Sequence, residues 1–421
     1  MNGKSGGDVQ PIYGSKYHGK SQRWLSDSFY SNSVFIILSS ILSSGVGLLF
    51  WILAANLYSK ENIGISTVLI SSASMVVLIS RLGLDQSMTR FFCERDRSTL
   101  FSSTAIITAL VALVVGMGFV LTADIWSPNL SMISNWGTPF ILLVLVQSVV
   151  VTTTSAFVAM RKAKLQLIQN IVMGSRLAWL FPLVGLGVIG IVSSFVLALG
   201  IVLIFSLYLL QKLSLKIRGI DRSFVRSSLS FSAGNYISAM LVGLPFLIMP
   251  LIVLNQLGAS ETANYYMAYS FANIVFTIPV ACSTQLFVEG SHGEELKKTT
   301  RKSLLASYLI LIPLIAAIFL WGKWLLGFLG MDYAEGGYGL LKLLALSSLL
   351  MVPFQTYFSI ILVRKEMKWL IVISLLNCIT ILGLSYLFLM TGDLESVGYA
   401  WILGYGMTSL FVYISARKMI Q

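Results

Sequence analysis

Twelve long apolar runs constrain the fold of this chain more than any other feature of its sequence. A helix that crosses about 30 Å of hydrocarbon needs roughly 20 apolar residues. Only 11% of the 421 residues are charged, whereas a soluble domain has about 25%. We therefore expect an all-α integral membrane protein with twelve transmembrane helices. The runs are Ser33–Leu57, Gly64–Leu84, Leu100–Thr122, Thr138–Met160, Leu165–Leu186, Val188–Leu210, Leu229–Leu257, Asn264–Val288, Ser303–Leu329, Tyr338–Val363, Trp369–Met390 and Val397–Ala416.

Basic residues are concentrated in alternate gaps between these runs. The other gaps, with the run ends beside them, contain only Lys60 and Lys323. By the positive-inside rule both termini are cytosolic, which requires an even number of spans. The formal net charge of +12 is thus a topology signal and does not indicate nucleic-acid binding. We expect a multi-pass protein of the cell membrane.

The chain resembles two copies of one unit. The turn Leu57–Asn62 shares its Leu and Glu with Leu257–Thr262, and the long basic loop Gln211–Arg226 separates six runs from six. Two halves in the same orientation form a parallel repeat, in which a transporter binds substrate between the halves. The predicted parts are a basic cytosolic tail (1–30), a six-helix bundle (31–210), a cytosolic linker (211–228) and a second six-helix bundle (229–421).

The seventh run carries the most helix-breaking residues: Gly234, Gly243, Pro245 and Pro250. Proline removes a backbone hydrogen bond and tends to kink a helix. A bendable seventh helix would suit alternating access, although proline is frequent in static membrane helices as well.

Several stretches resemble a known family. Arg81–Phe92 (RLGLDQSMTRFF) is similar to the end of the second helix in membrane proteins of polysaccharide biosynthesis. These are the lipid-linked oligosaccharide flippases of the multidrug/oligosaccharidyl-lipid/polysaccharide exporter superfamily. The turn Asn56–Gly64 resembles their first outer turn, and Ser227–Asn235 with Leu257–Tyr266 resembles the start of their second half.

This resemblance implies a V of two six-helix bundles that opens alternately to each side of the membrane. It also implies an activity, the transfer of an undecaprenyl- or dolichyl-linked sugar from the cytosolic to the outer leaflet. The sugar would cross through a polar cavity while the lipid tail stays in the bilayer. The implied partners are the polyprenyl-linked oligosaccharide, membrane lipids and the glycan polymerase or transferase that uses the product.

The charged residues inside the runs are basic. Arg176 lies 11 residues into its run, about 16 Å deep at 1.5 Å per residue, whereas no Asp or Glu lies near the centre of a run. A charge at membrane depth is costly and is usually kept for function, and guanidinium pairs well with phosphate. Arg176 is therefore the first candidate for binding an anionic cargo.

Three other cations are weaker candidates. Arg81 lies nearer the cytosolic edge, and an ion pair with Asp85 explains its presence there as well as ligand binding does. Arg90 lies at the membrane edge, where topology or snorkelling accounts for it about as well as ligand capture. Lys342 could act in release, although snorkelling to the outer surface also explains it.

Polar residues inside the runs could contact sugar hydroxyls. Asn170, Asn235 and Gln285 are the predicted ligands of this kind. Hydrogen bonds between helices are the alternative for each. The remaining polar candidates are Gln169, Tyr236, Asn273 and Gln355.

Other chemistries have little support in the sequence. The three cysteines and two histidines form no metal-ligand spacing, no Walker A motif occurs, and we expect no cofactor. A cation-coupled multidrug exporter of the same superfamily would need carboxylates within the membrane. A membrane glycan polymerase or ligase would need acid/base residues in outer loops, where the gap Ala123–Gly137 offers only Asp124. These two remain as alternatives.

Overall fold

The computed structural model describes residues 39, 42–92, 94–128, 133–291 and 294–420. Within these ranges every regular element is helical, and ten helices are long and apolar enough to cross a membrane. The all-helical membrane fold predicted from the sequence is confirmed. The predicted tail, residues 1–30, lies outside the described residues.

The chain folds into a series of helices joined by short connections. A first helix, Leu42–Leu57, is described only in part of its predicted run. The others are α2 (Lys60–Ser80), α3 (Leu84–Phe91), α4 (Arg97–Leu121), α5 (Ala123–Trp126), α6 (Ile133–Ala159), α7 (Ala163–Met173), α8 (Arg176–Leu180), the 3₁₀ turn η2 (Val184–Leu186), α9 (Val188–Lys212), α10 (Arg222–Leu257), α11 (Ala259–Ser291), α12 (Leu296–Gly327), α13 (Met331–Arg364), α14 (Met367–Leu389) and α15 (Glu395–Ile420).

Local sequence explains where several of these helices begin. Ser59 accepts a hydrogen bond from the backbone N–H of Asn62 at the start of α2, and Asp96 accepts one from Thr99 at the start of α4. Such caps satisfy backbone donors that have no partner within the helix. Gly258, with φ +85°, separates α10 from α11, a conformation that glycine adopts without strain.

The fifth apolar run is not one continuous helix, contrary to the prediction. The backbone N–H of Gly174 donates to Ile171 O at 3.0 Å and that of Ser175 donates to Val172 O at 2.9 Å. These tighter bonds interrupt the α-helix between α7 and α8. Glycine and serine have lower helix propensity than the leucines around them, and a mid-helix 3₁₀ stretch is often functional or strained.

Two further expectations about the runs need correction. The second run ends early, because Leu82 and Gly83 have positive φ values of 49° and 71° and separate α2 from α3. The seventh run, with Pro245 and Pro250 inside it, forms one continuous helix, α10. It also begins at Arg222, before the predicted start at Leu229.

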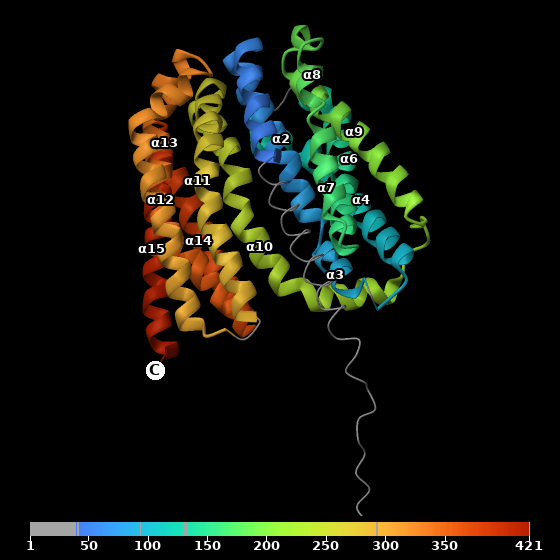
Figure 1. Ribbon diagram of the computed structural model, residues 1–421. Coiled ribbons are helices and arrows are strands. Elements are labelled where there is room, and N and C mark those ends of the chain that lie inside the picture. The colour runs from blue at the N-terminus through green and yellow to red at the C-terminus, as the bar shows by residue number, and fades with distance from the viewer. Residues whose placement is uncertain (1–38, 40–41, 93, 129–132, 292–293, 421) are drawn as a thin grey trace, which may run out of the picture.

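The helices form two groups that lie side by side in Figure 1. We call the first helix and α2–α9 the N-half, and α10–α15 the C-half. The end of the helices that carries the loops around Arg95, Lys162, Lys216 and Lys298 is called the basic end, and the opposite end the far end. In Figure 1 the first part of α10 runs along the basic end beneath the N-half before the helix turns up beside α11.

The two halves are closely packed at the far end. Gly64 on α2 lies so near the backbone of Ala259 on α11 that a Cβ at position 64 would collide with the Ala259 carbonyl oxygen. Asn255 donates a hydrogen bond to Trp126 O at 2.6 Å. The Lys60 ammonium lies 5.4 Å from the centre of the Tyr333 ring. The far end is therefore closed by contacts between the halves.

The segment between the halves is fixed to the N-half through three serines of α4. Backbone N–H groups of Lys216, Arg218 and Asp221 donate to the hydroxyls of Ser98, Ser102 and Ser103, respectively, at 3.2, 2.7 and 2.9 Å. These contacts give an extended segment the hydrogen bonds that it lacks within itself.

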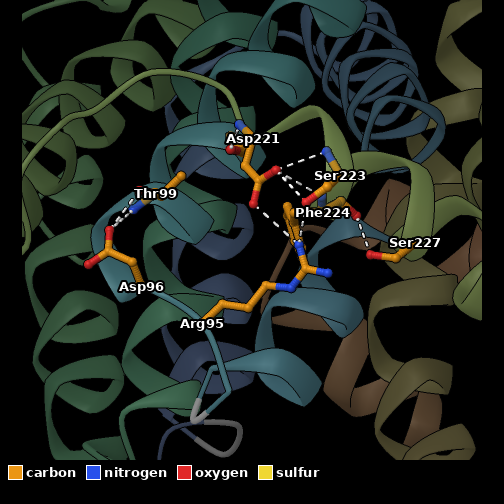
Figure 2. A network of polar contacts seen from close by, with 8 residues as sticks. Arg95, Asp96, Thr99, Asp221, Ser223, Phe224 and Ser227 are labelled. Carbon is orange, nitrogen blue, oxygen red and sulfur yellow. Dashed lines mark hydrogen bonds and ion pairs between the residues drawn. The ribbon is translucent and has the colours of Figure 1, made fainter.

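Asp221 completes this attachment. Figure 2 shows its carboxylate accepting hydrogen bonds from Ser223 and Phe224 at the start of α10 and facing Arg95. The Arg95 Nη1–Asp221 Oδ2 distance is 3.2 Å. Asp221 therefore joins the N-half to the first turn of α10.

We expect Asp221→Ala to lower the stability of the protein by about 0.5–2 kcal/mol near neutral pH, as for loss of other helix caps. Hydrogen bonding by Ser223, followed by backbone N–H groups and Arg95, lowers the pKa of Asp221. The stabilisation is thus present above the unfolded pKa of about 3.9 and is lost as the pH falls through the lower folded value. The difference in apparent unfolding midpoint between variant and wild type should disappear in acid.

Asp393→Ala, which alters an exposed carboxyl between α14 and α15, is the control. An equal effect of the control, or an effect that persists in acid, would contradict the role of Asp221.

Candidate functional site

Arg176 lies directly after the break between α7 and α8, with its guanidinium between two aromatic rings. The guanidinium carbon is 5.1 Å from the centre of the Phe50 ring and 4.8 Å from that of Phe195. Gly47 on the first helix lies beside it, since a Cβ there would be in van der Waals contact with Nη2 at 3.5 Å. The rings stabilise the cation through their negative faces.

Within the described part of the chain, no carboxylate forms an ion pair with Arg176. Its Nε is buried and has no hydrogen-bond partner there. Ring faces attract a cation but do not replace the acceptors that five guanidinium N–H donors can use. The site can therefore accept an anion without first breaking an internal ion pair.

Aromatic residues extend this site to the junction between the halves. The Trp51 ring on the first helix lies 4.9 Å from the ring of Tyr266 on α11 and 6.4 Å from that of Phe195. The Trp51 ring also lies 5.1 Å from the Phe50 ring that flanks the Arg176 guanidinium. The cation is thus adjacent to a contact that must change if the two halves separate.

Sequence reasoning did not identify the four aromatic residues around Arg176. Phe50, Trp51, Phe195 and Tyr266 lie in apolar runs, where aromatic side chains are ordinary core residues. Only their position around an unpaired cation distinguishes these residues, and that position depends on the packing of the first helix, α8, α9 and α11.

Arg81 is in a different environment, near the basic end. Its Nη2 lies 2.7 Å from Asp85 Oδ2, across the backbone break between α2 and α3. The ion pair offered as the alternative explanation is therefore present. Arg81 Nε is nevertheless buried without a hydrogen-bond partner among the described residues.

Two predicted polar residues of α10 join the halves beside Arg81. The side-chain amide of Asn235 donates to Gln86 Oε1 at 2.8 Å. The Tyr236 hydroxyl is 2.6 Å from Ile79 O, to which it donates. At the basic end, α10 therefore contacts the N-half through side chains as well as through the linker.

The remaining predicted residues do not converge on Arg176. Arg90 is exposed on the last turn of α3. Gln285 donates to Glu289 Oε1 at 3.1 Å on the same helix. The Lys342 ammonium lies 4.6 Å from the centre of the Tyr338 ring. The structure brings none of these three side chains to the aromatic site, and their roles in binding stay predictions.

Two of the predicted amides join helices of the N-half. Asn170 donates to the hydroxyl of Ser39 at 2.6 Å, and Gln169 donates to Thr153 and Ser206. On the C-half, Asn273 is half-buried on α11 and Gln355 is buried on α13. Asn170 is therefore already engaged in helix packing, two turns before Arg176.

Comparison with solved structures identifies the fold. The chain is similar to an inward-facing multidrug resistance transporter of the MATE family in the MOP superfamily, with a TM-score of 0.73 and 12% identity over 91% of this chain and 98% of that one. It is equally similar to the lipid II flippase MurJ in an inward closed conformation, with a TM-score of 0.73 and 11% identity over 91% and 87% of the chains. No protein-family model and no curated protein sequence matches the chain.

The similarity score also depends on the conformation of the solved transporter that is compared. An outward-facing MATE family transporter gives a TM-score of 0.63 at 13% identity, over 93% and 95% of the chains. This lower value agrees with the contacts that close the far end. The chain has the fold of MOP-superfamily transporters, and it is more similar to the inward-facing than to the outward-facing arrangement.

Proposed function

We propose that this protein is a flippase that moves a lipid-linked oligosaccharide, joined through phosphate or diphosphate, from the cytosolic to the outer leaflet. The observation that supports this proposal is Arg176, a cation inside the membrane domain whose guanidinium has no carboxylate partner in the described residues. It lies at the junction of two halves that must move relative to each other. A phosphate group can use the free guanidinium donors in a paired geometry.

The charge distribution and the closed far end support this direction of transport. The basic end corresponds to the cytosolic side by the positive-inside rule, and the far end is closed by the Gly64–Ala259 contact. This arrangement is the one expected for a transporter that is ready to receive cargo from the cytosol.

The membrane potential would assist this direction. A single negative charge moving outward gains about 2.3 kcal/mol per 100 mV when the inside is negative. Use of the glycan by a polymerase or transferase outside would make the net transfer irreversible.

Reconstitution in proteoliposomes tests the proposal. The protein should move a polyprenyl-diphosphate oligosaccharide between leaflets at least tenfold faster than a neutral polyprenyl glycoside with the same sugar. An enzyme that modifies only exposed sugar would report the transfer. Equal rates for the two lipids would exclude recognition of the phosphate, and absence of transfer across a panel of glycans would contradict the proposal.

A cation-coupled multidrug exporter is the alternative from the same fold. The acidic residues of the described chain lie at helix ends or in turns, and Asp85 is paired with Arg81. Such an exporter needs a carboxylate that can bind a cation within the membrane. Saturable export of cationic dyes driven by a proton or sodium gradient would favour this alternative.

A further inference from the structure

The segment that connects the two halves has exposed isoleucines in an otherwise basic sequence. Ile217 is 75% exposed and Ile220 is 44% exposed, between Lys216, Arg218 and Arg222. Isoleucine is among the residues most often found buried, whereas these two side chains are exposed beside cations. The segment therefore has the composition of a surface that contacts both headgroups and acyl chains.

The position of α9 places this segment at the surface of the bilayer. Ile204, Tyr208 and Lys212 are exposed and follow one another at four-residue intervals on one face of the helix. An apolar residue, then tyrosine, then lysine is the order expected on passing from hydrocarbon to headgroups. With 25 residues, α9 is about 38 Å long, which exceeds the roughly 30 Å of the hydrocarbon layer.

The segment is held in one place by the N-half. Its backbone N–H groups are bonded to the three serines of α4 described above. Leu215 and Phe224 are buried in a cluster with Leu84 and Met88. The backbone and these two side chains face the protein, so Lys216, Ile217, Ile220 and Arg222 are left exposed.

Most of the positive charge on this surface is uncompensated. Arg218 lies 3.3 Å from Asp96, and the Asp221 carboxylate faces Arg95. Lys212, Lys216, Arg222 and Arg226 form no ion pair with any carboxylate of the described residues. Near an anionic leaflet, each such cation strengthens binding about fivefold.

We propose that Lys212, Lys216, Ile217, Ile220, Arg222 and Arg226 form a binding surface for anionic phospholipids of the adjacent leaflet. The cations contact the lipid phosphates, and the isoleucines enter the acyl boundary. Bound lipid therefore stabilises the attachment of the linker to α4 and of the first turns of α10 to the N-half. This inference is independent of the transported substrate.

Binding of fluorescent phosphatidylglycerol to the full-length protein in neutral detergent tests the proposal. The triple variant Lys212→Gln/Lys216→Gln/Arg222→Gln should bind this lipid roughly tenfold more weakly than the wild type, the loss expected for a charged hydrogen bond to one lipid phosphate. The matched control is Lys297→Gln/Lys298→Gln/Lys302→Gln, which removes the same charge from exposed positions in the first turns of α12. It should change the affinity by no more than about twofold, because its charges lie outside the proposed surface.

A second variant keeps the test informative if the triple variant does not fold. Ile217→Ser retains every cation and every backbone hydrogen bond of the segment, and it should weaken lipid binding severalfold without changing its salt dependence. Inorganic phosphate should compete no better than sodium chloride at equal ionic strength. Equal losses in the two triple variants, unchanged binding by both linker variants, or effective competition by phosphate would overturn the proposal.

Discussion

Arg176→Ala should reduce transfer of a diphosphate-linked glycan roughly 10- to 100-fold in proteoliposomes. Loss of a charged hydrogen-bonding group costs about 1.5–3 kcal/mol of binding, and no other cation lies within the aromatic site formed by Phe50, Trp51, Phe195 and Tyr266 among the described residues. Arg176→Lys should retain part of the activity, because lysine keeps the charge but not the paired donor geometry.

The control for this prediction is Arg301→Ala, which removes an exposed arginine on α12. It should transport at the wild-type rate, and both variants should reach wild-type abundance in the membrane. Arg176→Ala should leave slow transfer of a neutral polyprenyl glycoside unchanged. If transfer of the anionic lipid is normal in Arg176→Ala, the site does not bind the phosphate.

Gly64→Val should prevent closure of the far end and thereby stop the transport cycle. Any Cβ at position 64 meets the backbone of Ala259, and a backbone cannot move aside as a flexible side chain can. Overpacking of this kind costs about 1–3 kcal/mol, enough to shift the population of closed molecules roughly 5- to 150-fold. Spin labels at Glu61 and Asp332, exposed residues at the far ends of the two halves, would report the longer distance.

Gly200→Val is the matched control, since a Cβ at Gly200 on α9 meets no atom within 4 Å. It should preserve the label distance, the unfolding midpoint and transport. The assignment of Gly64 to closure fails if Gly64→Val transports normally or if its label distances match those of the control.

The sequence predicted the membrane fold well because two independent signals agree. The hydrocarbon thickness sets the length of each apolar run, and Lys and Arg mark alternate gaps. The same kind of signal made Arg176 a candidate site residue, because a charge in such a run has few explanations; its role in binding stays a prediction. These signals depend on residue type and spacing along one helix, so packing is not needed to find them.

Other features depend on contacts between distant segments. Gly64 resembles many other glycines in membrane helices until Ala259 is placed beside it. Serines near a helix start normally bond to their own helix, so Ser98, Ser102 and Ser103 gave no indication that they bind the linker backbone. The break at Gly174–Ser175 was missed because isolated glycine is common in membrane spans.

The attachment of the linker to α4 has a consequence for synthesis of the protein. Ser98, Ser102 and Ser103 all precede the linker in the chain, so the ribosome has made every partner of this contact before it begins α11. The completed N-half can therefore fix the start of α10 at the basic end while the rest of the C-half is still being translated. The half already inserted would then help to set the orientation in which the later helices enter the membrane, together with the charges that flank those helices.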